Sequence, residues 1–199
     1  MRSPTLERAC GLLLALALLG PGACVSVPSD EGPREYLDET TAATVTAVEK
    51  PLVFAAERPE SAAHARDYVT LAGVSVNRGG RVDYVLVAYF WSTVDERMIL
   101  SPERYSNALV VVADDRQIRL VAKGDTPHDA GIGEAVHAPN GYAGAAQVYH
   151  TDLQTLRYIG SARQLAVIRE NGHDGAHYAI WDDGRDALGA LVRRASGER

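Results

Sequence analysis

The side chains best suited to acid–base or metal chemistry in this 199-residue chain are its six histidines, two of which lie in one long glycine-rich stretch. Residues 124–144 carry His128, Asp129, Glu134 and His137 without a sustained hydrophobic period. Imidazole and carboxylate groups of this kind bind zinc, which activates water. Their spacing matches no established metal motif, so solvated loop side chains are the more ordinary interpretation. Because irregular stretches of this length are often functional, the loop is where we first expect a site.

The remaining histidines form no chelating pair in the sequence. His64 and His150 stand alone, and His173 and His177 lie four residues apart. That spacing binds a metal on a helix, where both imidazoles project from adjacent turns. Here the two residues fall on a predicted turn and strand, so the geometry for chelation is missing. We expect neither a metal nor another cofactor.

Motifs for covalent catalysis and phosphate binding are missing from the sequence. Ser75 and Ser161 lack the glycine frame of a nucleophile elbow. The run Gly131-Ile132-Gly133 lacks the third glycine and the strand-to-helix setting of a phosphate loop. These absences favour a noncatalytic protein, although catalytic residues drawn from distant strands would leave no local signature.

Aromatic residues cluster in one predicted strand, which contains Tyr84, Tyr89, Phe90 and Trp91. They could form the floor of a binding groove if one face of the sheet were open, but aromatic residues at strand spacing are more typical of a core. As candidate ligand contacts we single out Trp91 and, because it lies in the long loop, Tyr142.

The elements that must position these residues are organised around a predicted β-hairpin at residues 68–95. From residue 82 to residue 94 both the even and the odd positions are largely apolar, which predicts a central strand covered on both faces. In the first strand the apolar phase changes from Val69 and Leu71 to Val74 and Val76. An extra residue near Gly73 would produce that change, so the pattern predicts a β-bulge.

The other predicted elements place the chain in the α+β class. We expect a mostly antiparallel β-sheet or β-sandwich with a short helix and a C-terminal helix packed on it, because hairpins recur and no βαβ repeat is visible. The predicted elements are a strand over 44–54 broken at Pro51, a hairpin over 108–122, a strand at 147–150, a helix capped by Thr151 or Asp152 and ending at Gly160, a hairpin over 165–181, and a helix over 184–195. They form a single predicted domain over residues 44–199.

The amino terminus predicts export. Arg2 and Arg8 precede an apolar run over 12–19, which is shorter than the roughly 20 residues of a bilayer span, and small residues follow it. The sequence Gly22-Ala23-Cys24 resembles the lipobox of bacterial lipoproteins, with Pro21 where that family has an aliphatic residue. The resemblance implies a signal peptide over 1–23, a diacylated Cys24 and a flexible tether over 24–43. An ordinary secretory signal cut near Ala23 is the alternative.

The resemblance also implies a location. Val25, rather than aspartate, follows the cysteine, which in that family implies sorting to the periplasmic face of the outer membrane. The inner membrane and a soluble periplasmic product are the alternatives. The formal net charge of −6 argues against nucleic acid and against electrostatic attachment to anionic lipid.

Together these features predict a noncatalytic envelope lipoprotein that binds or scaffolds another component. Its expected partners are the membrane, through the lipid, and another envelope protein. The alternative is a metal-dependent or other hydrolase with its site on the 124–144 loop.

Overall fold

A computed structural model of the chain describes residues 32–94, 108–141, 146–169 and 177–198. In these ranges the elements, in chain order, are β1 (Arg34–Asp38), β2 (Ala43–Ala47), β3 (Leu52–Glu57), β4 (Arg66–Arg78), β5 (Arg81–Ser92), β6 (Ala108–Ala113), β7 (Arg116–Val121), β8 (Gln147–Thr151), α2 (Leu153–Ser161), β9 (Leu165–Arg169), β10 (His177–Asp182) and α3 (Arg185–Ser196). The strands belong to one sheet, and each recorded pairing is antiparallel. The predicted α+β class with a mostly antiparallel sheet is confirmed.

The β4–β5 hairpin is the centre of the sheet. β5 pairs with β4 on one side and β8 on the other, while β2 and β3 pair one after the other with the far edge of β4. The β4–β5 register runs without a shift from Asp67 opposite Ser92 to Arg78 opposite Arg81, so the predicted bulge is wrong. Position 73 needs glycine for a different reason, because a Cβ there would lie 2.6 Å from Leu188 Cδ1 of α3.

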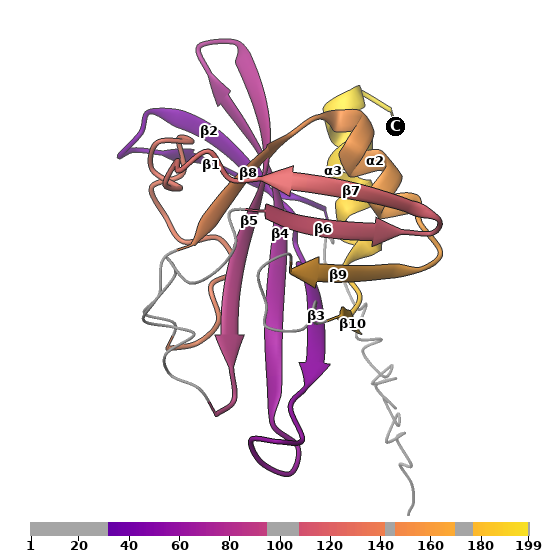
Figure 1. The fold of residues 1–199 in the computed structure, drawn as a ribbon. Coiled ribbons are helices and arrows are strands. Elements are labelled where there is room, and N and C mark those ends of the chain that lie inside the picture. Colours follow the sequence, from indigo (N-terminus) through magenta and orange to yellow (C-terminus); the bar gives the residue numbers. More distant parts are fainter. Residues whose placement is uncertain (1–31, 95–107, 142–145, 170–176, 199) are drawn as a thin grey trace, which may run out of the picture.

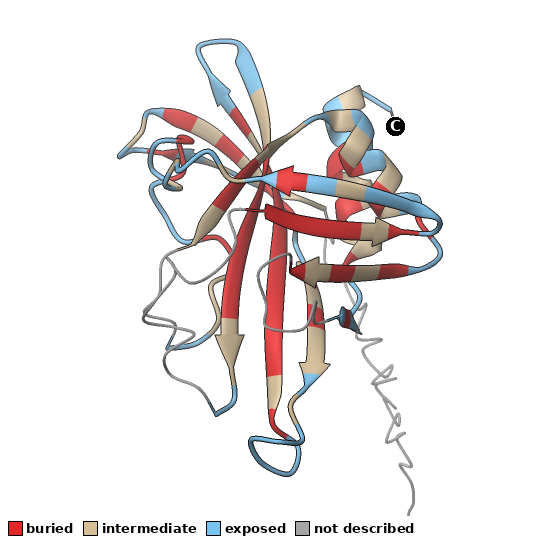
Figure 2. Cartoon of the chain, viewed as in Figure 1, coloured by how far each residue is buried: buried red, intermediate tan, exposed pale blue. Residues whose placement is uncertain are grey.

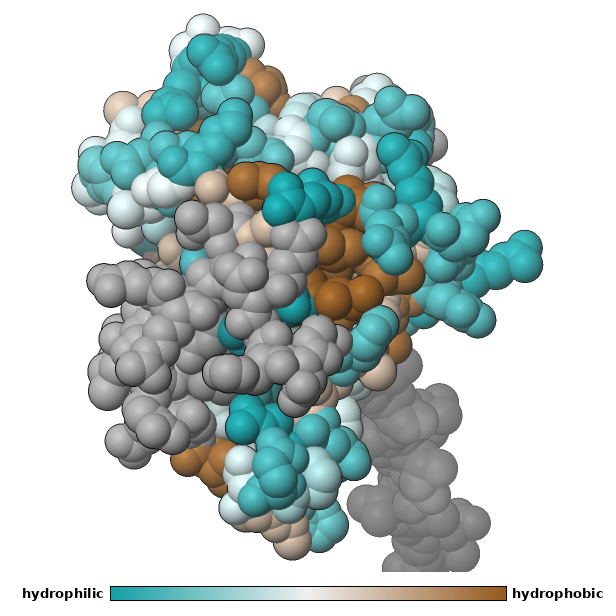
Figure 3. Space-filling model, viewed as in Figure 1, coloured by the Kyte–Doolittle hydropathy of each residue, from teal (hydrophilic) through white to brown (hydrophobic). Residues whose placement is uncertain are grey.

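The sheet curls so that its two ends approach each other. The path runs β8-β5-β4-β3-β10-β9-β6-β7, and Cα atoms of β7 and β8 come within 8 Å. In Figure 1, β6, β7 and β9 cross in front of the long central strands, so the curled sheet forms two layers. Its outer side at β6 and β9 carries apolar side chains, among them the half-buried Val112 and Ile168 (Figure 3).

The core lies inside the curl, where alternate residues of the central strands face those of β6 and β9 (Figure 2). Buried residues on this inner face include Phe54, Val69, Leu71, Leu86, Phe90, Leu109, Val111 and Val167. Helix α3 contributes the predicted Leu188, Leu191 and Val192, each at most 3% exposed. Helix α2 packs on α3, where a Cβ at Gly160 would lie 3.4 Å from Gly189 N.

The start of α2 follows the predicted capping chemistry, but its predicted end at Gly160 is wrong: the helix runs to Ser161, and its C-cap is Ala162 in an extended conformation. Of the two predicted N-caps for α2, Asp152 is the one used: its Oδ1 accepts from Thr155 N at 2.7 Å. Helix α3 begins after Gly184 and ends at Gly197, whose φ of 70° suits a left-handed C-cap. Among the described residues, no helix is both long and apolar enough to cross a membrane.

The predicted tether overlaps the sheet. Residues 34–38 form β1, which pairs with β2 from Arg34 opposite Ala47 to Asp38 opposite Ala43. The sequence does not predict this strand, because its side chains are largely exposed, Leu37 at 66%, and show no apolar pattern. Backbone hydrogen bonds hold it at the edge of the sheet. Cys24 and residues 25–31 of the predicted tether lie outside the described residues.

Candidate ligand-binding groove

The described part of the long loop covers one face of the β1–β2–β4–β5 end of the sheet. Ala130, Ile132 and Val136 are buried, and a Cβ at Gly131 would lie 2.9 Å from Val76 Cγ1 of β4. This part of the loop therefore covers apolar side chains on the outer side of the sheet and extends the core there.

A buried carboxylate fastens the loop to β1. Asp38 is 2% exposed and accepts backbone N–H bonds from Gly133 at 2.6 Å, Thr40 at 3.0 Å, Thr41 at 3.1 Å and Glu134 at 3.2 Å. Burial by itself would raise the pKa of this carboxyl, but the four N–H donors outweigh it and hold the pKa below its ordinary value. A Cβ at position 133 would lie 2.7 Å from Asp38 Oδ1, so this anchor requires glycine there.

The structure does not bring the four loop residues considered as metal ligands together at one site. Asp129 closes a local turn, accepting from Thr126 N at 2.9 Å and from Thr126 Oγ1 at 2.7 Å, and its neighbour His128 is exposed. Hydrogen bonding from the Thr126 side chain lowers the pKa of Asp129. Among the described residues, no group of three or more His, Cys, Asp or Glu side chains could hold a metal ion.

Glu134 and His137, by contrast, line a common hollow of about 190 Å³ with Arg34, Tyr36 and Glu49. His137 Nε2 lies 2.6 Å from the Val48 carbonyl oxygen, and because a carbonyl only accepts, Nε2 is the donor. Burial, with the charges of Asp38 and Glu134, raises the pKa of Tyr36, which keeps its phenol protonated.

The remaining histidines are dispersed. His150 Nε2 lies 2.7 Å from Asp125 Oδ2, an ion pair if the imidazole is protonated. His177 is exposed on β10, on the same face as Ala179, as its strand position predicts. His64 is exposed in the β3–β4 connection. His173 and Tyr142 lie outside the described residues.

The aromatic residues of β5 divide into core and surface. Tyr89 and Phe90 are each 3% exposed, as a core role predicts. Trp91 stacks on Tyr68 with ring centroids 4.0 Å apart and planes 8° apart, and its Nε1 donates to Thr70 Oγ1 at 3.1 Å. One face and the N–H of this candidate ligand contact are therefore already engaged within the sheet.

Trp181, which no pattern in the sequence singles out, is 56% exposed beside this stack. Its ring meets Tyr68 edge-on at 6.1 Å, and the Arg66 guanidinium lies 4.6 Å from its centroid. A bulge between Ile180 and Asp182 places it there.

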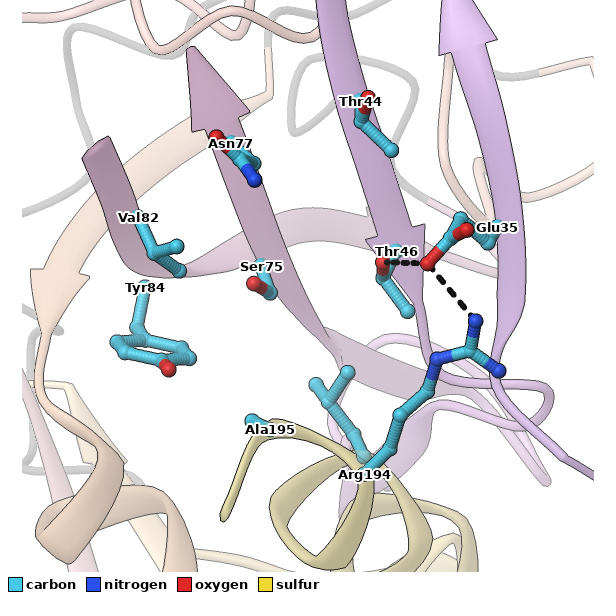
Figure 4. A pocket seen from close by; sticks show the side chains of 10 residues that line it. Glu35, Thr44, Thr46, Ser75, Asn77, Val82, Tyr84, Arg194 and Ala195 are labelled. Atoms are coloured by element: carbon cyan, nitrogen blue, oxygen red, sulfur yellow. Dashed lines mark hydrogen bonds and ion pairs between the residues drawn. The ribbon is translucent and has the colours of Figure 1, made fainter. Parts of the chain in front are cut away.

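The fourth aromatic residue, Tyr84, faces an open groove at the other end of β5 (Figure 4). The groove has a volume of about 180 Å³ and lies over β1, β2, β4 and β5, with the last turn of α3 as its wall. It is lined by Glu35, Thr44, Thr46, Ser75, Asn77, Val82, Tyr84, Leu191, Arg194 and Ala195. These side chains lie on the opposite face from Asp38, because Glu35 pairs with Thr46 and Asp38 with Ala43.

Most polar groups in the groove have hydrogen-bonding capacity to spare. Within the described part of the chain, the hydroxyls of Thr44, Ser75 and Tyr84 make no hydrogen bond. Asn77 Oδ1 accepts from Gly80 N at 2.9 Å, which leaves the amide NH₂ as a donor on the groove side (Figure 4).

The two charged residues of the groove form an ion pair with each other. Arg194 Nη2 donates to Glu35 Oε2 at 2.8 Å, and Thr46 Oγ1 donates to the same oxygen at 3.3 Å (Figure 4). The pair joins the end of α3 to β1 and leaves the lining without net charge.

One pattern in the sequence does indicate the groove. Polar side chains occupy alternate positions on neighbouring strands, Thr44 and Thr46 on β2 and Ser75 and Asn77 on β4, while the positions between them are apolar. Such alternation indicates a sheet face open to water. The contributions of Glu35 and Arg194 had no such signal, because β1 and the helix end are distant in sequence.

Comparisons with known proteins give no relative: no protein family, curated protein or solved structure matches the chain.

Proposed function

We propose that this chain is a noncatalytic binding domain of a bacterial envelope lipoprotein, exported by residues 1–23 and anchored through a lipid on Cys24 at the periplasmic face of the outer membrane. The observation that carries the binding role is the open groove at Tyr84, where hydroxyl and amide groups from neighbouring strands converge with unused hydrogen-bonding capacity.

The chemistry of the groove supports binding rather than catalysis. A general base or nucleophile needs an ionisable group poised to exchange a proton with the substrate. The charged pair in the groove, Glu35 and Arg194, is held together at 2.8 Å, and the other polar groups are aliphatic hydroxyls, one phenol and an amide, with no imidazole among the lining residues. Such a surface recognises a ligand without activating it.

The start of β1 defines how far the proposed anchor lets the domain reach. The ten residues from Cys24 to Pro33 precede β1. At about 3.6 Å per extended residue they span at most about 35 Å. The domain would therefore work close to the membrane, within reach of ligands in or beside the envelope.

Two measurements test this proposal. In membrane fractionation, Cys24→Ser should shift the protein to the soluble fraction and remove the mass of the lipid; equal membrane retention and mass would refute the anchor. In crosslinking from intact cells, Ser75→Gln, which fills the groove, should lose the partner that the parent captures. Arg119→Gln, on the exposed side of β7, is the matched control. Equal capture by both variants would refute the role of the groove.

A hydrolase remains the alternative, favoured by one observation: Glu134 and His137 line the same hollow. Protein purified without an affinity tag should show no bound zinc and no thermal shift with added zinc if the binding proposal is right. Stoichiometric zinc with a stabilisation of RT ln(1 + [L]/Kd), lost in His137→Ala and kept in His128→Ala, would favour the enzyme instead.

A further inference from the structure

We propose that the groove at Tyr84 accepts a neutral, polyhydroxylated ligand, one saccharide unit of a longer glycan. This inference rests on the proposed binding function and specifies the chemical class of the ligand.

The hydrogen-bonding inventory fits alcohols. Hydroxyl groups both donate and accept, and the groove presents Thr44, Ser75 and Tyr84 hydroxyls together with the donor amide of Asn77. A ligand that also donates and accepts at closely spaced positions, as a sugar does, can pair with each of them. A ligand without such groups would leave them desolvated and unpaired, which is costly.

The charge of the groove excludes strongly ionic ligands. An anion such as phosphate is normally held by free cationic side chains or by several backbone N–H groups. Arg194, the cation in the groove, is already paired with Glu35 at 2.8 Å. One paired carboxylate likewise falls short of the six to eight oxygen ligands of calcium. The lining is therefore matched to a ligand without net charge.

Apolar surface beside the polar groups matches the amphiphilic faces of a sugar ring. The half-buried ring of Tyr84 and the exposed side chains of Val82 and Ala195 lie next to the hydroxyls. Aromatic residues with a polar tip suit ligands that are apolar on one side and wet on the other. A small inorganic ion would leave this apolar surface unused.

The size and openness of the groove indicate one unit of a chain. Its volume of about 180 Å³ is below the ~300–1,000 Å³ of pockets that enclose a drug-sized ligand. It lies on the face of the sheet, where side chains make the contacts. Peptides that add a strand bind instead to the backbone at a sheet edge, so the groove is not placed for that mode.

The test is titration of ¹⁵N-labelled protein with neutral tetrasaccharides of N-acetylglucosamine, glucose and mannose, each separately, and with inorganic phosphate. We expect saturable amide shifts at β2, β4 and β5 residues of the groove with at least one saccharide and none with phosphate. Thr44→Val, Ser75→Ala and Tyr84→Phe each remove one hydroxyl and keep the shape. Each should weaken binding about two- to tenfold, since a hydrogen bond is worth ~0.5–1.5 kcal/mol.

The control is Trp181→Ala, which removes an exposed aromatic side chain outside the groove and should leave the affinity unchanged. Saccharide binding that Trp181→Ala abolishes and the hydroxyl variants leave intact would overturn the proposal. So would phosphate shifts in the groove, or no shift with any saccharide. If no saccharide binds while the groove still captures a protein in cells, the ligand class is wrong and the binding function stands. If no saccharide binds and the groove captures no protein, both the proposed ligand class and the proposed binding function are refuted.

Discussion

The two faces of the β1–β2–β4–β5 end use polar side chains in opposite ways. Under the loop, the buried Asp38 carboxylate accepts four backbone N–H bonds. On the other face, the hydroxyls of Thr44 and Ser75 make no hydrogen bond among the described residues and face an open groove. Strand β1 supplies the covered carboxylate, and the neighbouring strands β2 and β4 supply the two hydroxyls. The difference teaches that the role of a polar cluster depends on whether its hydrogen bonds are already made. A cluster with its hydrogen bonds made stabilises the fold, and one without them is available to a ligand.

The largest expected effect is on the covered face. Ile132 is 2% exposed beneath the loop, and truncating a buried Ile to Ala typically costs ~2–5 kcal/mol. Ile132→Ala should therefore lower the urea midpoint strongly. Val82→Ala, at a residue 43% exposed on the groove face, should change the free energy of unfolding by less than about 0.5 kcal/mol. Equal midpoints for the two variants would break the comparison.

The next effect concerns the anchor itself. Asp38→Ala removes the acceptor of four N–H groups, and leaving such donors buried without a partner costs ~1–3 kcal/mol. Glu35→Gln breaks an exposed ion pair on the opposite face, where such pairs are worth ~0–1 kcal/mol. Urea denaturation of both variants measures the difference. A larger loss from Glu35→Gln would contradict the assignment of roles.

The pH dependence of Asp38 sharpens the same point. Because its folded pKa lies below the unfolded value, its contribution is complete above the unfolded pKa, about 3.9, and is lost as the pH falls through the folded pKa. The stability gap between the parent and Asp38→Asn should be constant above about pH 5 and shrink below about pH 4. Urea midpoints across this range check it; a gap that grew on acidification would show the wrong sign.

The smallest effect is expected for the groove hydroxyls. Thr44→Val and Ser75→Ala remove groups without partners in the described fold, so stability should stay within about ±0.5 kcal/mol of the parent. Circular dichroism and urea midpoints measure this. A loss as large as that of Asp38→Ala would mean that these hydroxyls belong to the structure and not to a binding surface.

The sequence was sufficient for the α+β class and for every described element but β1, because the central hairpin and the helices leave strong local signals. Buried residues at both phases of β5 indicated a central strand, and Leu188, Leu191 and Val192 marked the packed face of α3. Strand β1 was not predicted, because backbone pairing holds it in the sheet while most of its side chains remain exposed. No local pattern distinguishes such a strand from a tether.

The candidate site was harder to predict because the change of apolar phase along β4 has a cause other than a bulge. The shift from Leu71 to Val74 predicts a bulge, but the register of β4 with β5 is continuous. What changes along β4 is the surroundings: its odd positions pass from the inner core at Leu71, past α3 at Gly73, to the open groove at Ser75. Which face is covered depends on the loop and α3, whose positions are long-range properties of the fold.

The pairing of β3 with β10 also has a consequence for how the chain folds. Strands β4 and β5 are adjacent in sequence and can pair as soon as both exist, whereas Phe54 of β3 lies opposite Ile180 of β10, near the other end of the chain. Contacts between distant segments form slowly because a long loop must close first. The edge of β3 that pairs with β10 therefore lacks its partner until β10 has been synthesised. We expect this edge to be the point at which a nascent chain is most exposed to mispairing and most dependent on holding chaperones.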